Sequence, residues 1–427
     1  MNRAPFLTAD RLRGYPRLFL AVYAAIAVVW VCLSHNLIDP SGKPLGFDFI
    51  TFWGASWLAQ HGHAASIYDP VALWAAQRIA VPDTPQPYLW HYPPPFLLMV
   101  YPLASLPYVV ALVIFLFVGF ALYVATMRRI FPGAVWLIAA YPAVLLVALH
   151  GQATFLLVAV VAGGCMMLDR RPVLAGLILG LVVCKPHLAL LFPVALIASG
   201  RWRTLGGMTA SAIGLIVASA LAFGLRPWRG FLADLPLARR VLEEGLLPWD
   251  TMPTVFAAAR MQGASVRAAY AAQTVSALAI VASVALLWRG GEGDSRLKVA
   301  ALVTGCLLIS PYTFDYDLIL LAFPIGLLAQ WGVGRTGPWL VPLLGACVLT
   351  PILLPPIAKA TSIQLMPLVL ATLFGSVVFW HSERGSSVVT TALPLSPSEQ
   401  TESGSGAVVP GTPRRDGPSG LRAEPWP

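Results

Sequence analysis

The stretch RLFLAVYAAIAVVWVCLSH, residues 17–35, decides the class of fold. It carries no Asp, Glu, Lys or Arg after its first residue, and a helix that spans a bilayer needs about 20 apolar residues. The basic segment MNRAPFLTADRLRGYPR before it resembles the start of a signal peptide. No small-residue cleavage site follows, so we expect a retained first transmembrane helix.

The composition of the whole chain also indicates a membrane protein. Of its 427 residues, 58% are hydrophobic and 11% are charged, whereas soluble domains carry about 25% charged residues. The net charge of +9 does not indicate nucleic-acid binding, because basic residues in short loops orient a multispanning protein. The cysteines have no metal-binding or redox spacing, so we expect packing roles for Cys32, Cys165, Cys184, Cys306 and Cys347.

Apolar runs and Lys/Arg clusters together predict an all-α protein with about twelve transmembrane helices, some of them short or broken. The predicted domains are a cytoplasmic arm at 1–17, a multispanning domain at 18–381 and a disordered cytoplasmic tail at 382–427. The tail is rich in Ser, Pro, Gly and Thr and has no apolar period. Two large loops, at about 35–95 and 225–267, are placed outside and are expected to carry amphipathic helices.

Two segments are predicted to enter and leave the membrane on the same side. Residues 173–200 are too long for one straight span, and basic clusters flank both ends. We expect two short helices that meet at CKPH, residues 184–187. Residues 299–332 repeat this pattern around SPYTFDYD, residues 310–317. Helix breaks occur at membrane depth only where protein or a water-filled cavity covers them.

The unusual polar motifs fall almost entirely on the predicted outer side. Asp48 precedes FITFWGASWLAQHG and is either a helix cap or a catalytic carboxylate. The helix after it clusters aromatic residues, and we expect it to lie flat in the membrane interface. Lys185 and His187 lie between apolar half-helices, where ionisable residues are functional candidates, with a snorkelling lysine as the alternative. HGQ, residues 150–152, is either a simple turn or part of a site.

Signatures of soluble enzymes are missing from the sequence. It contains no phosphate-binding glycine loop, no HExxH and no GxSxG. The outward acidic and basic residues, with the aromatic helix, predict a site for an anionic lipid head group and a polar acceptor. A transporter or flippase of a lipid-linked or anionic substrate is the alternative, although its polar groups would follow a path through the membrane. A scaffold for envelope assembly is a third interpretation.

Several stretches, in this order and spacing, resemble glycosyltransferase family 87, whose members are similar to polyprenol-phosphate-mannose-dependent mannosyltransferases with the GT-C membrane fold. The first-loop Asp48 is followed by FWGASWLAQHGHAASIYDP, YPPPFLLMVYPLASLP, HGQATFLL, GLILGLVVCKPHLALLFP, MPTVFAAARMQGA and LISPYTFDYDLILL. The resemblance spans about 40–380. It excludes the tail.

The resemblance implies transfer of mannose or another hexose from a polyprenyl-phosphate carrier, with inversion, to an envelope lipid or glycan. The lipid-linked sugar is a substrate, so we expect no cofactor. Some GT-C enzymes use a divalent metal, but the sequence has no dense carboxylate cluster that demands one, so we expect no metal, and we expect no nucleic-acid partner. Together with the charge pattern, the resemblance places the protein in a bacterial-type plasma membrane, with both termini cytoplasmic and the active site facing outward.

The resemblance also implies residue roles. Asp48 falls at the position of the carboxylate that takes the acceptor proton. Positive charge on the donor phosphate would come from Lys185, His187, Arg226 and Arg229. Similar sequences often carry Gln where this chain has His187. The sugar and acceptor pocket would be shaped by Trp53, Tyr68, Asp69, His91, Tyr92, Gln152, Asp315 and Asp317.

Overall fold

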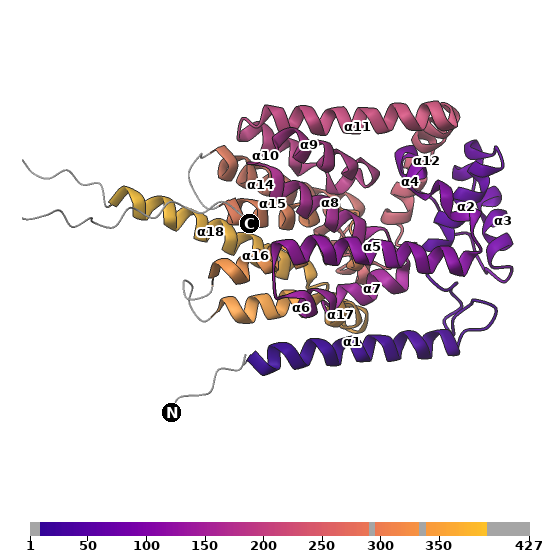
Figure 1. Cartoon of the computed structure of the whole chain (residues 1–427), viewed down its shortest axis with the longest axis horizontal. Coiled ribbons are helices and arrows are strands. Elements are labelled where there is room, and N and C mark those ends of the chain that lie inside the picture. The colour runs from indigo at the N-terminus through magenta and orange to yellow at the C-terminus, as the bar shows by residue number, and fades with distance from the viewer. Residues whose placement is uncertain (1–8, 290–294, 333–338, 391–427) are drawn as a thin grey trace, which may run out of the picture.

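The computed structural model describes residues 9–289, 295–332 and 339–390, and within these ranges every regular element is a helix. Five helices are long and apolar enough to cross a membrane. They are α1 (Ala9–Cys32), α5 (Tyr108–Ile130), α11 (Trp202–Phe223), α14 (Val266–Arg289) and α17 (Leu340–Thr361). Figure 1 shows α1, α5 and α11 running along the long axis of the molecule. The chain is therefore an all-α membrane protein.

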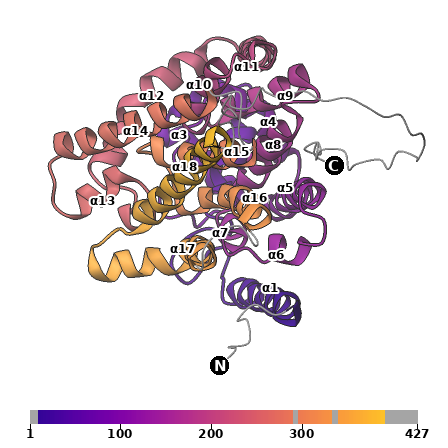
Figure 2. The same ribbon diagram turned by 90° about the vertical axis from the view of Figure 1, so that its left-hand side faces the viewer.

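Further helices fill the bundle between these five. They are α6 (Val135–Ala139), α7 (Ala143–His150), α8 (Thr154–Met167), α9 (Pro172–Gly180), α10 (Leu191–Ala198), α15 (Ser295–Ile309), α16 (Ala322–Gly332) and α18 (Met366–Thr390). The main hydrophobic core lies among them. Figure 2, which looks along the long axis, shows α1 at the edge of the bundle. There α1 is attached by the Tyr23 hydroxyl, which donates to the Ala140 carbonyl, and by Arg17 over the Trp136 ring.

The remaining elements gather at one end of the long axis (Figure 1). They include α2 (Phe49–Gln60), α3 (Pro70–Ala80), α4 (Pro94–Val100) and α12 (Arg226–Glu243), with the short helices η1 (Ala64–Tyr68) and η2 (Tyr101–Ser105). The short helices η5 (Trp249–Thr251) and α13 (Val255–Met261) follow α12. We call this the Asp48 end, and the opposite end, where Asp169 follows α8, the Asp169 end.

Both predicted helix breaks are present. In the first, η3 (Leu181–Cys184) and η4 (Pro186–Leu188) separate α9 from α10, with Lys185 between them. In the second, α15 ends at Ile309 and the chain resumes in η6 (Asp315–Leu321), which leads into α16. The apolar segment between α5 and α8 is also divided, into α6 and α7. Twelve membrane crossings remain a prediction, since five helices among the described residues are both long and apolar enough to span alone.

Helix α2 differs from its expected place in the membrane interface. Apolar residues occur all round it, and nine of its residues, from Phe49 to Leu58, are buried. They pack in a second hydrophobic core with residues of α3, α4 and the start of α5. A helix that is apolar on every side is buried, whereas an interfacial helix needs a polar face. The expectation of a flat amphipathic helix after Asp48 is therefore corrected.

The predicted domain boundaries fall inside helices. Helix α1 begins at Ala9, within the predicted arm, and α18 continues to Thr390, past the predicted start of the tail. Residues 1–8 and 391–427 lie outside the described residues.

Helices α9 and α11 approach each other closely because glycines lie at their contact. A Cβ on Gly180 would lie 2.5 Å from the Met208 carbonyl oxygen, and one on Gly207 would lie 2.5 Å from that of Val173. A Cβ on Gly176 would overlap the Thr204 carbonyl. Small residues at such contacts let helix backbones pack tightly in membranes.

We expect Gly176→Ala to destabilise the bundle, because the new methyl group has to push α11 away. Overpacking of this kind costs about 1–3 kcal/mol, so the melting temperature in detergent should fall. Gly206→Ala is the matched control on α11, where nothing lies within 4 Å of the new Cβ. Equal melting temperatures for the two variants would contradict the contact described here.

Candidate active site at the Asp48 end

Two turns packed back to back position Asp48. The Asp48 N–H donates to the carbonyl of His150 at 3.1 Å. Gly46 and Gly151 both have positive φ, +79° and +61°. A Cβ on Gly151 would lie 2.7 Å from the Gly46 carbonyl oxygen, so only glycine permits this approach. Phe47 also has a positive φ of 31°, a strained conformation of the kind that clusters at functional sites.

The Asp48 carboxylate faces the turn of α7 into α8. Its Oδ2 accepts a hydrogen bond from Gln152 Nε2 at 2.8 Å and lies 3.4 Å from His150 Nδ1. The Tyr92 hydroxyl donates to Gln152 Oε1 at 3.1 Å, which orients the amide. Although Asp48 immediately precedes α2, its side chain makes no cap hydrogen bond. Of the two alternatives for Asp48, the geometry therefore does not support the helix cap.

The surroundings of Asp48 keep it ionised. Burial raises the pKa of its carboxyl, but the hydrogen bond and charge of His150, the Gln152 amide and the charge of Lys185 outweigh burial and lower the pKa below its ordinary value. The side chain is still 33% exposed. An ionised, partly open carboxylate can accept a proton from a substrate hydroxyl.

A buried ion pair joins the two helix breaks beside this carboxylate. Lys185 Nζ lies 2.8 Å from Asp317 Oδ1, with exposures of 6% and 1%. Lys185 also donates to the Thr154 hydroxyl at 3.4 Å, and the Phe314 N–H donates to Asp317 Oδ2 at 3.2 Å. The charge of Lys185 is therefore already balanced by protein. Any anion that reaches Lys185 has to share it with Asp317.

The Tyr316 ring connects the two parts of the cluster. Lys185 Nζ lies 4.9 Å from the centroid of the Tyr316 ring. The centroids of the His150 and Tyr316 rings are 5.1 Å apart. Asp315, the next residue, is also buried, and its carboxylate accepts the Tyr316 N–H at 2.8 Å. Residues from the first loop, the α7–α8 turn and both helix breaks thus form one polar cluster, which we call the Asp48 cluster: Asp48, Tyr92, His150, Gln152, Thr154, Lys185, Asp315, Tyr316 and Asp317.

Helix α12 is tied to this cluster through the first loop. His91 Nδ1 and Asp234 Oδ2 are 2.7 Å apart, and both side chains are largely buried. The Tyr68 hydroxyl donates to the Tyr92 carbonyl at 2.7 Å, while the Tyr68 ring packs on Gly230. These contacts fix the backbone of Tyr92, whose hydroxyl holds Gln152.

Other residues predicted for the site make no hydrogen bond to the cluster. Trp53 is buried in the α2 core and donates to the Leu106 carbonyl. Asp69 is exposed and caps α3, where it accepts the Val71 N–H at 2.9 Å. The His187 ring packs edge-on against the Tyr312 ring, with ring centroids 6.1 Å apart. Arg226 and Arg229 are exposed on the first turns of α12 and make no ion pair among the described residues.

The structure adds four residues to those predicted for the site: His150, Thr154, Asp234 and Tyr316. His150 belongs to the same HGQ motif as Gln152, so the prediction of a site residue could have been extended from Gln152 to His150. Asp234 is 143 positions from its partner His91, and nothing in a single sequence connects two such distant residues.

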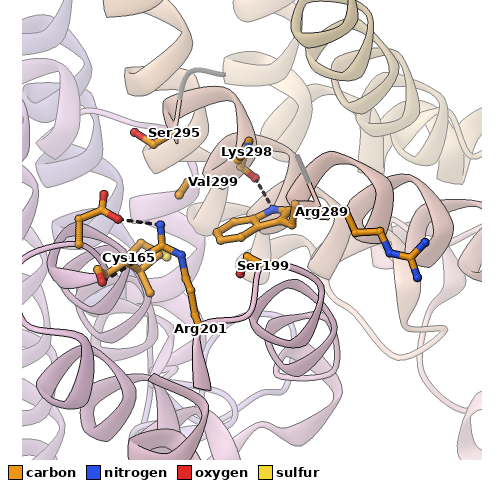
Figure 3. Close-up of a pocket in the computed structure, with 10 residues that line it drawn as sticks. Cys165, Ser199, Arg201, Arg289, Ser295, Lys298 and Val299 are labelled. Carbon is orange, nitrogen blue, oxygen red and sulfur yellow. Dashed lines mark hydrogen bonds and ion pairs between the residues drawn. The ribbon is translucent and has the colours of Figure 1, made fainter. Parts of the chain in front are cut away.

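A separate pocket of about 210 Å³ lies at the Asp169 end. Figure 3 shows Ser199, Arg201 and Lys298 around it. Arg201 pairs with Asp169 at 2.6 Å. Helix α8 separates this pocket from the Asp48 cluster, since Thr154 begins the helix and Cys165 lines the pocket. With 14 residues at about 1.5 Å each, the helix is about 20 Å long, so the pocket is distinct from the cluster.

Apolar helices around a partly open polar cluster, with an ionised carboxylate beside a buried lysine, define an integral membrane protein with an enzyme-like site. Residues 90–311, just over half of the chain, match the sequence model of glycosyltransferase family 87. The chain belongs to this family and is a membrane glycosyltransferase. No curated protein and no solved structure matches the chain significantly. The matched region includes Tyr92, Gln152 and Lys185, whereas Asp48 precedes it and Asp317 follows it.

Proposed function

We propose that this glycosyltransferase moves a hexose, mannose in the first instance, from a polyprenyl-phosphate carrier to an envelope lipid or glycan. In this proposal the Asp48 end faces outward from a bacterial plasma membrane. The observation that carries it is the Asp48 carboxylate, which Gln152 and His150 hold on Oδ2. No other partner of this carboxylate is found among the described residues, so Oδ1 is open to a substrate hydroxyl.

The proposed reaction is a direct displacement. The acceptor oxygen bonds to the anomeric carbon as the bond from that carbon to the phosphate oxygen breaks. The bonding electron pair leaves with polyprenyl phosphate, and the acceptor proton passes to Asp48 Oδ1. Attack from the face opposite the phosphate inverts the anomeric carbon. Positioned general bases of this kind contribute about 10²–10⁴-fold to rate.

The leaving phosphate needs positive charge close to Asp48. The Tyr316 ring contacts both Lys185 and His150. The charge of Lys185 also lowers the pKa of Asp48. His187 lies two residues further along the same helix break. Preorganised cations at a developing anion are among the strongest catalytic contributions known. We assign the departing phosphate to the charge of Lys185, which Asp317 holds in place before the donor arrives. We also assign it to an N–H of the neutral His187 ring, whose buried Nε2 has no hydrogen-bond partner among the described residues.

Arg226 and Arg229 support the arrival of the donor. Helix α12 begins three residues after α11 ends at Phe223, so both arginines lie close to where a long apolar helix leaves the membrane. Arginine binds phosphate with two parallel hydrogen bonds, and neither guanidinium is engaged by a carboxylate among the described residues. A carrier phosphate at the bilayer surface would meet these two residues first.

The test is reconstitution of the full chain in liposomes with a panel of polyprenyl-phosphate sugars and total envelope lipid. We expect mass spectrometry to detect a product heavier by one hexose only when a polyprenyl-phosphate hexose is present. The proposal would be overturned if a nucleotide sugar gave the product equally well. It would also be overturned if none of the carrier-linked donors in the panel gave a product.

A further inference from the structure

His150 contacts Asp48 directly, yet the transfer reaction described above does not use it. Its carbonyl accepts the Asp48 N–H at 3.1 Å and its Nδ1 lies 3.4 Å from Asp48 Oδ2. The side chain is 24% exposed, so it shares the opening of the site with the carboxylate. Backbone and side chain of one residue thus both hold Asp48.

The His150 ring is fixed on both sides. It packs edge-on against Phe47 with ring centroids 5.0 Å apart, and it contacts Tyr316 at 5.1 Å. A ring held in this way cannot swing away from Asp48 without displacing the ring of Phe47 or Tyr316. The distance between the imidazole and the carboxylate is therefore set by the fold.

We propose that His150 is a positioning residue whose protonation controls Asp48. The neutral ring holds the carboxylate in place and leaves it basic, whereas the imidazolium clamps it as an ion pair and slows proton removal from the acceptor. This inference rests on the proposed transfer reaction, because it assigns the proton to Asp48.

The charges around His150 favour a titration at physiological pH, where an unperturbed histidine already changes charge. Asp48 and Asp315 face the ring with negative charge, and Lys43 opposes them. Burial lowers the pKa of His150, but the hydrogen bond and charge of Asp48 and the charge of Asp315 outweigh burial and raise the pKa above its ordinary value. The imidazolium should therefore persist to a pH above about 6.5.

The sign of the pH dependence follows. As pH falls through the pKa of His150, the ring gains a proton, Asp48 becomes less basic and the rate declines. Wild-type kcat should therefore decline as the pH is lowered, and the midpoint of this decline should lie above about pH 6.5. His150→Asn keeps an N–H near the position of Nδ1 but cannot titrate. Its midpoint should shift to lower pH, because the imidazole no longer titrates, while KM for the donor stays unchanged.

The experiment compares pH profiles of kcat and KM for wild type, His150→Asn and His150→Ala in liposomes. His63→Asn is the matched control, because His63 is exposed between α2 and η1 and should follow wild type. His150→Ala should lower kcat about 10-fold or more, since it also loses the hydrogen bond. If wild type is active and His150→Asn follows its profile, the inference fails while the proposed function stands.

A second measurement needs no turnover. Diethylpyrocarbonate modifies neutral histidine, so the pH midpoint of His150 modification, followed by mass spectrometry, reports its pKa. In Asp48→Asn this midpoint should fall, because the carboxylate that stabilises the imidazolium is gone. If no donor supports transfer, the proposed function fails and the role in transfer fails with it, and this midpoint then tests the coupling of His150 to Asp48. An unchanged midpoint in Asp48→Asn would overturn the coupling of the two residues.

Discussion

Asp48→Asn should abolish sugar transfer while leaving the protein folded. The amide is nearly the same size as the carboxylate and keeps an oxygen that can accept the Gln152 hydrogen bond, but it cannot take up the acceptor proton. Loss of a positioned general base reduces rate by about 10²–10⁴-fold. The measurement is single-turnover transfer from a polyprenyl-phosphate hexose, with the melting temperature as a check on folding.

Asp83→Asn is the matched control for this substitution. Asp83 accepts a hydrogen bond from Asn36 on the exposed surface of the same loop, away from the Asp48 cluster. It should transfer sugar at the wild-type rate. Full activity of Asp48→Asn, with product confirmed, would show that another group takes the proton.

Lys185→Met should strongly destabilise the protein. Removing one partner of a buried ion pair leaves the other as an unpaired buried charge, which costs about 3–5 kcal/mol. Here Asp317, at 1% exposure, would remain between the two helix breaks. Among the described residues its remaining hydrogen-bond donors are the Thr154 hydroxyl and the Phe314 N–H. We expect a lower melting temperature in detergent, or failure of the protein to accumulate in the membrane.

The double variant Lys185→Met/Asp317→Leu separates stability from activity. It removes both charges, so most of the stability should return, but transfer should stay absent because no lysine meets the leaving phosphate. Lys359→Met, at an exposed position in the last turn of α17, is the control for loss of a lysine. If Lys185→Met alone melts at the wild-type temperature, the ion pair contributes little to the fold.

The class of fold follows from the sequence because bilayer thickness imposes it. The apolar runs predicted the five long helices, and the basic clusters on both sides of 173–200 predicted a break at Lys185. The burial of α2 was not predicted because its aromatic residues, from Phe49 to Trp57, resemble the apolar face of an interfacial helix. Ile50, Ala55 and Leu58 make its other sides apolar as well. Hydrophobicity around the whole helix was the better signal.

The candidate site was predictable only in part. Asp48, Gln152 and Lys185 were identified as unusual polar residues in short motifs, and the structure brings all three together. Their pairing was not predictable, because Lys185 meets Asp317 over 132 positions and Asp48 meets Gln152 over 104. Asp69 caps α3 in the structure, and its sequence context also indicates this, since an Asp before Pro at a helix start is a typical cap.

The central claim is that carrier-borne sugar is transferred at the Asp48 cluster, and product stoichiometry tests it most directly. Liposomes containing wild type or Asp48→Asn are given a polyprenyl-phosphate hexose and acceptor lipid, and both products are measured together. We expect wild type to release one polyprenyl phosphate for each glycosylated acceptor, with inverted anomeric configuration, and Asp48→Asn to release neither. Movement of intact carrier across the bilayer without either product would contradict the account and indicate a flippase.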